Sequence, residues 1–181
     1  GHTLAIAEHC PDVRILGIEL DPILMAQFRR EHPDIASRII LVNENYANLT
    51  EIIRKNDFTP DAVLFDLGLS SWHYESSGRG FSFLKDEPLD MRYDPEHGQL
   101  TAAQIVNTYP REQIGHLLRE YGEEQFADAI AERMIAMRGE RPILTTAQLV
   151  GIIEEVVPAW YRHRKIHCAT KTFQALRIAV N

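Results

Sequence analysis

Residues 14–22, RILGIELDP, decide the fold of the first part of the chain. The apolar run before Glu19 is typical of a strand buried on both faces. Asp21 follows at once and is placed to cap a helix, with Pro22 at the first helical position. A strand that passes directly into a helix is the repeating unit of a parallel sheet, so this stretch predicts an α/β fold.

The same alternation continues on both sides of this stretch. We expect helices over residues 3–10, 21–28 and 49–55, and strands over residues 14–18, 38–42 and 61–65. This order favours a parallel, doubly wound sheet covered by helices. Ligands of such sheets bind outside the carboxyl ends of the strands, so Glu19, Tyr46 and Asp66, at or just after strand ends, are candidate site residues.

The character of the sequence changes after Asp66. Residues 67–100 are rich in Gly, Ser, Pro and charge without a regular period, which indicates a long functional or mobile loop. Thr145 and Gln148 then form a capping-box pattern before the last of three expected helices. These helices are expected over residues 113–121, 123–138 and 147–157. A small helical domain therefore begins near residue 100.

Composition limits the class of protein. With 181 residues, 45% hydrophobic and 25% charged, the chain is composed like a globular protein of one large domain, or of one domain with an insertion. Its net charge of -7 means that any site for a polyanion must be a local patch. No apolar run approaches the ~20 residues of a membrane span. Cys10 and Cys168 match neither a disulfide framework nor a zinc ligand spacing, which favours a reducing, cytoplasmic setting.

Each strand-end residue has two interpretations. An acid about 20 residues after a glycine turn typically accepts hydrogen bonds from ribose hydroxyls, and Glu19 lies 18 residues after Gly1; alternatively Glu19 is a solvated residue before a helix. Asp66 follows four apolar residues and needs donors, which the Ser/Gly loop supplies, or it merely caps that loop. Tyr46 either stacks on a base or packs on the sheet.

Separated stretches of the chain match one known family in order. They are GH (1–2), DLGLSS (66–71), RGFSF (79–83), PLDMR (88–92), YGEE (121–124) and KTFQALRI (171–178). In these stretches the chain resembles the bacterial S-adenosylmethionine-dependent methyltransferases of the MraW/RsmH family. The resemblance implies methylation of N4 of a cytidine at the decoding centre of small-subunit (16S) ribosomal RNA.

The resemblance also implies an architecture. It is a Rossmann-like class I methyltransferase fold, a doubly wound sheet with an inserted helical substrate-recognition domain. Residues 1–75 would bind S-adenosylmethionine, 76–100 would form a loop facing the active site and the RNA, 101–170 the helical insertion, and 171–181 the return to the methyltransferase domain. By the same comparison the first strand, most of the glycine turn and the last strands are expected to lie outside this chain.

Cofactor residues follow from the matched positions. Gly1 and His2 would lie against the methionine part of the cofactor, Glu19 at its ribose, Tyr46 by its adenine, and Asp66 close by. His73 would take the last position of the cofactor loop, where the family usually has Gln: its Ser-Ser-Pro-Gln pattern is Ser-Ser-Trp-His here. The imidazole can donate or accept as Gln does, but with a different reach.

The chemistry needs positioning rather than a metal. The cytosine amine is a weak nucleophile, so catalysis depends on holding it in line with the methyl group, with an acceptor on its hydrogens. An Asp/Asn-Pro-Pro-aromatic loop, which many amino-group methyltransferases use, does not occur. Asp66, with Ser70 and Ser71, is therefore the candidate for positioning the amine.

The expected partner is small-subunit ribosomal RNA or the small subunit itself. Candidate RNA-binding residues, aided by Trp160 and Tyr161, are Arg79, Arg92, Arg162, Arg164, Lys165, Lys171 and Arg177. Such a run of charge is often only a solvated face, but residues 161–181 contain no acid. The spacing of His163, His167 and Cys168 gives no closed tetrahedral metal site. Lys171 replaces an Arg of the family, which keeps the charge but loses the bidentate fork.

Two other classes of function are open. A non-catalytic RNA-binding relative of the family would explain the unusual Trp72-His73 pair. A nicotinamide-dependent dehydrogenase shares the fold class, but nothing in the chain resembles the acid/base pair of a substrate domain.

Overall fold

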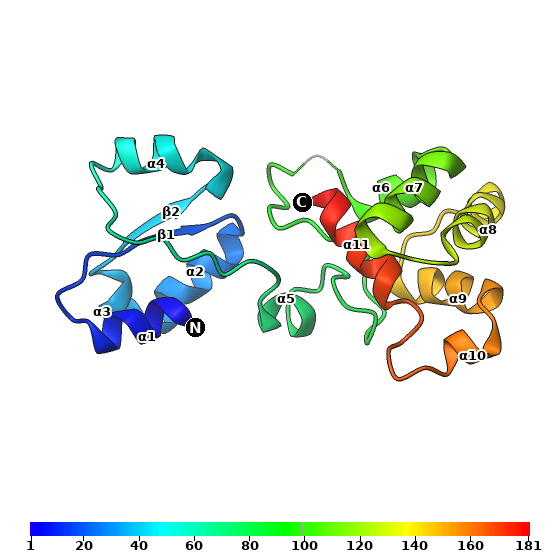
Figure 1. Ribbon diagram of the computed structural model, residues 1–181, viewed down its shortest axis with the longest axis horizontal. Coiled ribbons are helices and arrows are strands. Elements are labelled where there is room, and N and C mark those ends of the chain that lie inside the picture. Colours follow the sequence, from blue (N-terminus) through cyan, green and yellow to red (C-terminus); the bar gives the residue numbers. More distant parts are fainter. Residues whose placement is uncertain (99) are drawn as a thin grey trace. The chain divides into compact units, whose positions relative to one another are not determined.

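The computed structural model describes residues 1–98 and 100–181 and forms two compact units, Gly1–Gly68 and Leu69–Asn181. The first unit contains a small parallel sheet and the second is helical (Figure 1). The expected mixture of helix and parallel sheet is therefore confirmed.

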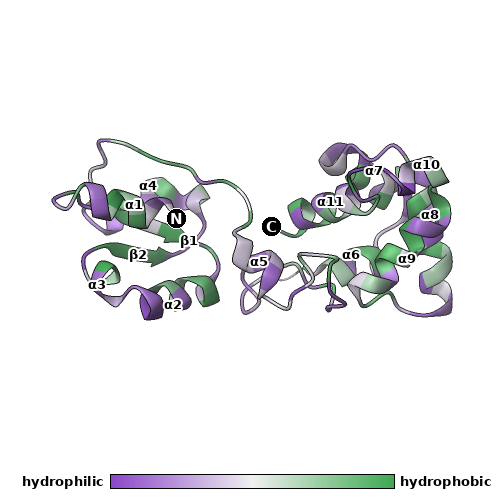
Figure 2. Ribbon diagram, turned by 90° about the horizontal axis from the view of Figure 1, so that it is seen from below, coloured by the Kyte–Doolittle hydropathy of each residue, from purple (hydrophilic) through white to green (hydrophobic). Residues whose placement is uncertain are grey.

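The sheet of the first unit consists of β1 (Leu16–Glu19) and β2 (Ile40–Asn43). The strands run parallel, with Leu16 opposite Ile40 and Glu19 opposite Asn43. The helices of this unit are α1 (His2–His9), α2 (Pro22–Glu31), α3 (Pro33–Ala36), the 3-10 turn η1 (Tyr46–Asn48) and α4 (Leu49–Lys55). Helix α4 lies on the opposite side of the strands from α2 and α3 (Figures 1 and 2).

Helix α2 begins as the sequence predicts. The Asp21 side chain is fully buried, and its Oδ1 accepts the backbone N–H groups of Ile23 at 2.9 Å and Leu24 at 3.2 Å. Pro22 occupies the first turn, where its missing N–H costs nothing. This cap turns the chain back immediately after β1 and so fixes where Glu19 ends the strand.

The strand predicted over residues 61–65 is wrong. Within the described residues β1 and β2 pair only with each other, and the segment runs extended without a partner. Val63, Leu64 and Phe65 are 55%, 61% and 53% exposed. An apolar pattern specifies an extended chain, but a strand also needs a neighbouring backbone to accept and donate its hydrogen bonds.

The second unit holds most of the buried core. Its helices are α5 (Ser71–Glu75), α6 (Ala102–Thr108), α7 (Arg111–Gly122), α8 (Ala127–Glu140), α9 (Thr146–Val156), α10 (Ala159–Arg162) and α11 (Thr170–Val180). Helix α7 packs between α8 and α11, and α9 packs on α8. The segment expected as a long loop supplies Phe81, Leu89 and Met91 to this core, each at most 1% exposed.

Two helix boundaries of this unit depend on backbone contacts. The capping box of α9 is confirmed, because the backbone N–H of Thr145 donates to Gln148 Oε1 at 3.2 Å and the Gln148 N–H donates to Thr145 Oγ1 at 3.4 Å. Glu123 adopts a left-handed backbone (φ 50°) and ends α7. The helix expected from residue 123 therefore begins only at Ala127.

The two strands of the first unit are hydrophobic, as Figure 2 shows. All residues of β1 and β2 are partly buried except Asn43, which is exposed. No helix of the described part of the chain is both long enough and apolar enough to cross a membrane.

Candidate functional site

The carboxyl ends of β1 and β2 are held together by a side chain. Asn43 Nδ2 donates to the backbone oxygens of Glu19 at 2.8 Å and Leu20 at 2.9 Å. The Glu19 carboxylate, half-buried, accepts the backbone N–H of Asp21 at 2.9 Å. Glu19 therefore has a fixed position at the edge of the sheet where a parallel sheet binds ligands. Asn43 was not among the predicted site residues, and the polar run Asn43-Glu44-Asn45 after the strand is the sequence signal that could have indicated it.

Tyr46 follows β2 and remains 57% exposed. Its ring meets the Phe65 ring edge-on, with centroids 5.9 Å apart and planes at 72°. Phe65 is itself 53% exposed, so this aromatic pair is open to solvent rather than part of a core. The contact joins the end of β2 to the extended segment that leads to Asp66.

His2 and Asp66 form a pair at the end of that segment. His2 Nδ1 lies 2.7 Å from Asp66 Oδ2, and the two side chains are 61% and 70% exposed. The expectation that Asp66 is a buried acid held by the Ser/Gly loop is therefore wrong: its partner is an imidazole at the start of α1. Gly1, the N-cap of α1, is exposed.

The charge at these strand ends is acidic. The backbone N–H of Asn45 and the Asn48 amide donate to Glu44, and these hydrogen bonds lower the pKa of its carboxyl. Glu44 lies between the end of β2 and Asn45, the residue that caps the 3-10 turn η1. Glu19 ends β1, Glu44 directly follows β2, and Asp66 belongs to the same unit.

Ser70, Ser71 and His73 belong to the second unit. The Ser70 backbone N–H donates to His73 Nδ1 at 3.3 Å, and Ser70 Oγ lies 3.0 Å from the same nitrogen. The His73 ring is 3% exposed and lies edge-on to Phe81 and Tyr93, with centroids 5.1 Å and 5.0 Å away. His73 therefore holds the start of α5 inside an aromatic cluster, whereas Ser71 is exposed. Their roles toward cofactor and base stay predictions.

Arg79 and Arg177 bind protein groups. Arg79 is 7% exposed, and its Nη1 donates to the backbone oxygens of Arg92 at 2.7 Å and Tyr93 at 2.9 Å. Arg177 Nη1 donates to the Phe81 oxygen at 2.9 Å, and burial lowers the pKa of its guanidinium. These two cations tie the segment around Phe81 to its neighbours, a role that charge alone did not indicate.

Arg92 forms a two-pronged ion pair with Asp90. Its Nε lies 2.7 Å from Oδ1 and its Nη2 lies 2.6 Å from Oδ2. Burial alone would raise the pKa of Asp90, but the hydrogen bonds from Arg92 outweigh it and lower that pKa below its usual value. The same hydrogen bonds raise the pKa of Arg92. Like the contacts of Arg79 and Arg177, the ion pair between Arg92 and Asp90 is a contact within the protein.

The remaining candidate cations lie near the surface. Arg162, Arg164 and Lys165 are exposed, and the Arg164 guanidinium lies over the Tyr161 ring at 4.2 Å. Lys171 is half-buried, and its Nζ donates to the Glu123 backbone oxygen at 2.6 Å. Among the candidate cations, Arg162, Arg164 and Lys165 thus form the exposed basic segment.

Glu154, His167 and Cys168 bring one potential metal-ligand atom each within 4.8 Å of one another. Two features oppose a cation there. The Ala169 backbone N–H donates to His167 Nδ1 at 3.2 Å, which places the proton of a neutral ring on Nε2, the nitrogen nearer Glu154. Helix α11 also begins just beyond Cys168, and a helix N-terminus repels cations. Burial, together with the Glu154 charge, raises the pKa of the Cys168 thiol. We assign no metal to this cluster.

Comparison with known proteins places the whole chain in one family. Residues 1–181 match the MraW methylase family. The chain is 44% identical to the "Ribosomal RNA small subunit methyltransferase H" of Desulfosudis oleivorans, over 100% of this chain and 59% of that protein. Proteins of the same name are 44% identical in Dehalococcoides mccartyi and 41% identical in Mycolicibacterium smegmatis, with 51% and 48% of their lengths covered.

The chain thus spans about half the length of the curated relatives it matches. Since the family match runs over all described residues of both units, it includes the acidic strand ends and the exposed basic segment alike. The chain belongs to the MraW methylase family.

Proposed function

We propose that the protein containing this chain is an S-adenosylmethionine-dependent methyltransferase that methylates N4 of a cytidine in small-subunit ribosomal RNA, at the decoding centre. The observation that carries the proposal is the match of the entire chain to the MraW methylase family, together with relatives named as small-subunit ribosomal RNA methyltransferases. The cytoplasm, where ribosomal subunits are found, is the proposed location.

In the proposed fold the small sheet is part of a doubly wound, Rossmann-like class I methyltransferase sheet, and the helices form an inserted substrate-recognition domain. Residues 1–75 serve the cofactor, 76–100 face the active site and the RNA, 101–170 recognise the RNA and 171–181 return to the methyltransferase domain. The support is the parallel pairing of β1 with β2 and the change to helices in the second unit.

The strand ends fit the cofactor. S-adenosylmethionine supplies a methyl group on a positively charged sulfur, and it carries an adenosine. Glu19 stands where a ribose-binding acid stands in nucleotide-binding sheets, the exposed Tyr46 ring offers an aromatic surface to adenine, and Gly1 leaves open space beside His2. The acidic side chains of this unit favour a cationic ligand over an anionic one.

Asp66 has the chemistry to position the amine. Its carboxylate is exposed and can accept a hydrogen bond from the exocyclic amine of cytosine, which localises the nitrogen lone pair for attack on the methyl carbon. The His2 ring at 2.7 Å orients that carboxylate. Ser70 and Ser71 are proposed to assist from the following loop, and His73 to complete the cofactor loop. No step requires a metal.

The proposed RNA surface contains the exposed cations Arg162, Arg164 and Lys165, which can bind phosphates. Lys171 adds charge from the start of α11. Arg79, Arg92 and Arg177 act in this proposal by holding the shape of the second unit, since their guanidiniums bind backbone oxygens and Asp90.

The proposal is tested with the full-length protein. We expect it to transfer a methyl group from S-adenosylmethionine to cytidine N4 of small subunits or their RNA, and Asp66→Ala to abolish most of this transfer. Asp12→Ala, which removes an exposed acid of the same unit, is the matched control and should keep full activity. Calorimetry decides between an enzyme and a non-catalytic RNA-binding relative, because a full-length protein that binds no S-adenosylmethionine contradicts the enzyme.

A further inference from the structure

Trp160 is an exposed aromatic side chain that is nevertheless held in place. It lies in α10 and is 62% exposed. Its ring touches the Tyr161 ring at 89°, with centroids 5.6 Å apart, and the Phe126 ring at 60° and 6.0 Å. Because these contacts are steeply inclined rather than stacked, they fix the indole and leave most of its surface to solvent.

Cations follow Trp160 immediately. Arg162, Arg164 and Lys165 are exposed, and residues 156–181 contain no acid. Arg164 is restrained as well, because its guanidinium lies 4.2 Å above the Tyr161 ring. An anionic ligand that reaches Trp160 therefore meets the restrained charge of Arg164 and the exposed charges of Arg162 and Lys165 beside it.

Tyr161 anchors this arrangement from the inside. The ring is 1% exposed and its hydroxyl donates to the Glu124 carboxylate, which accepts it at 2.9 Å and 3.0 Å. Tyr161 stands between Trp160 and the cations in the sequence. Its ring contacts the Trp160 ring and the Arg164 guanidinium, so Tyr161 restrains both side chains. The indole and the Arg164 guanidinium are thus restrained before a ligand binds.

We infer that Trp160 is a stacking platform for an unpaired RNA base, with phosphates of the same strand bound by Arg162, Arg164 and Lys165. This inference rests on the proposed function and specifies it further, because it requires single-stranded RNA at this surface. Only an unstacked base can place its face on an indole, whereas a duplex offers this surface its phosphates but no free base.

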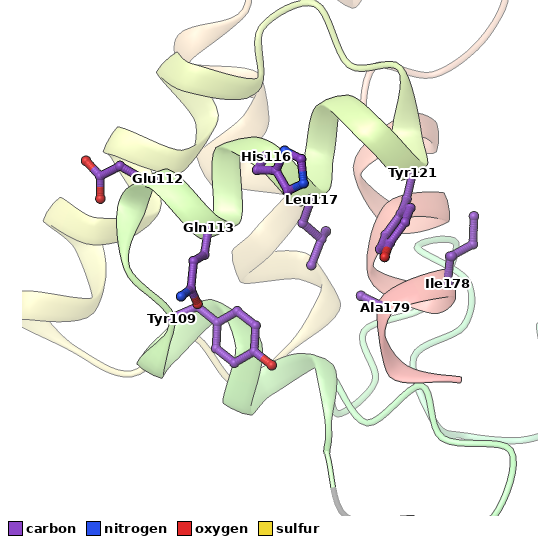
Figure 3. Close-up of a pocket in the computed structure, with 8 residues that line it drawn as sticks. All are labelled: Tyr109, Glu112, Gln113, His116, Leu117, Tyr121, Ile178 and Ala179. Carbon is purple, nitrogen blue, oxygen red and sulfur yellow. The ribbon is translucent and has the colours of Figure 1, made fainter.

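The second unit has another aromatic-lined surface, a pocket of about 500 Å³ between α6, α7 and α11 (Figure 3). Tyr109 and Tyr121 line it around Leu117. Glu112 also lines it, and among the described residues no Lys or Arg does. The titratable side chains of the lining include Glu112 and His116, so phosphates would meet a carboxylate and an imidazole there instead of a cluster of permanent cations, and charge favours Trp160 over this pocket.

Fluorescence tests the stacking contact. The chain contains two tryptophans, so the emission lost between the full-length Trp72→Phe variant and the Trp72→Phe/Trp160→Phe double variant is that of Trp160. The probe is an unstructured oligoribonucleotide of ~12 nucleotides, compared with a duplex of the same sequence. We expect saturable quenching of Trp160 by the single strand and little quenching by the duplex. Equal quenching by both, or none by a single strand that binds, overturns the inference.

Binding of the labelled single strand tests the energy of the contact. Stacking of one base is expected to make Trp160→Ala bind roughly 5- to 150-fold more weakly, with most of the affinity restored in Trp160→Phe. Tyr121→Ala is the matched control, since it removes an aromatic side chain of the pocket that is 46% exposed. A loss in Tyr121→Ala without a loss in Trp160→Ala assigns the base to the pocket and overturns the inference.

Methyl transfer by the wild-type protein separates the two proposals. If the wild type methylates cytidine while Trp160→Ala binds the single strand unchanged, the platform is wrong and the proposed function stands. If the wild type neither binds S-adenosylmethionine nor transfers a methyl group, the proposed function is wrong, and the quenching and binding results still decide whether Trp160 stacks on RNA.

Discussion

The Tyr161 hydroxyl donates to the Glu124 carboxylate inside the helical unit, and both residues are 1% exposed. The same carboxylate accepts the Phe126 backbone N–H at 3.0 Å. A buried carboxylate is costly unless donors surround it. The Glu124 carboxylate therefore joins the turn after α7 to α10, and it depends on both the Tyr161 hydroxyl and the Phe126 N–H as donors.

Tyr161→Phe is expected to lower the free energy of unfolding by ~1.5–3 kcal/mol, because it removes a buried hydrogen bond to a charged group. Chemical denaturation of the wild type and the variant measures this difference. Unchanged stability would show that the carboxylate finds another donor.

The same pair predicts a dependence on alkaline pH. Burial, with the hydrogen bond to Glu124 and its charge, raises the pKa of Tyr161 to about 12, above the ~10 of an unfolded tyrosine. The neutral phenol is thus stabilised by folding, so this contribution is complete below pH ~10 and is lost as the pH rises through about 12. The stability difference between wild type and Tyr161→Phe should shrink over that range. A constant difference would contradict the assignment.

Gly122 is predicted to accept no side chain. A Cβ there would lie 2.5 Å from the Lys171 backbone oxygen, where α7 crosses α11. Gly122→Ala should therefore destabilise the protein by ~2–3 kcal/mol through overpacking. The control is Gly139→Ala in α8, where nothing lies within 4 Å and Ala should stabilise by up to ~1 kcal/mol. Equal effects in thermal unfolding would contradict the close approach.

Asp90 is expected to make the protein sensitive to acid. Its pKa is lowered in the folded state, so its stabilising effect is present above the unfolded value of ~3.9 and is lost as the pH falls through the lower folded value. Asp90→Asn should cost ~1–3 kcal/mol at neutral pH and remove that part of the acid dependence. Glu132→Gln, at an exposed acid of α8, should change neither. Denaturation curves collected from neutral to acidic pH provide the measurement.

We predict that the main role of His73 is to stabilise the start of α5. His73→Ala should lower the free energy of unfolding by ~2–4 kcal/mol, because it leaves a cavity among the rings and an unsatisfied Ser70 N–H. His73→Gln should cost only ~1 kcal/mol, since Gln also serves in capping boxes. His163→Ala, at an exposed imidazole, is the neutral control. If His73→Gln leaves stability and S-adenosylmethionine affinity unchanged, the imidazole has no role of its own.

Local sequence determined the elements whose signals are complete within a few residues. The cap at Asp21, the capping box from Thr145 to Gln148 and the strands that became β1 and β2 follow from short-range hydrogen bonds and apolar periodicity. The family motifs also named candidate residues, and the structure brings two of them, His2 and Asp66, together at 2.7 Å.

Tertiary structure decided what depends on a distant partner. Residues 61–65 have the pattern of a strand, but pairing requires a neighbouring backbone that the pattern does not specify. Arg79 and Arg177 carry the same charge as Arg164, yet backbone oxygens far along the chain hold them while Arg164 stays exposed. Charge and hydropathy are properties of one residue, whereas pairing and burial are properties of the fold. The sequence by itself therefore determined the family and the local caps, and the three-dimensional packing decided which of its cations remain exposed.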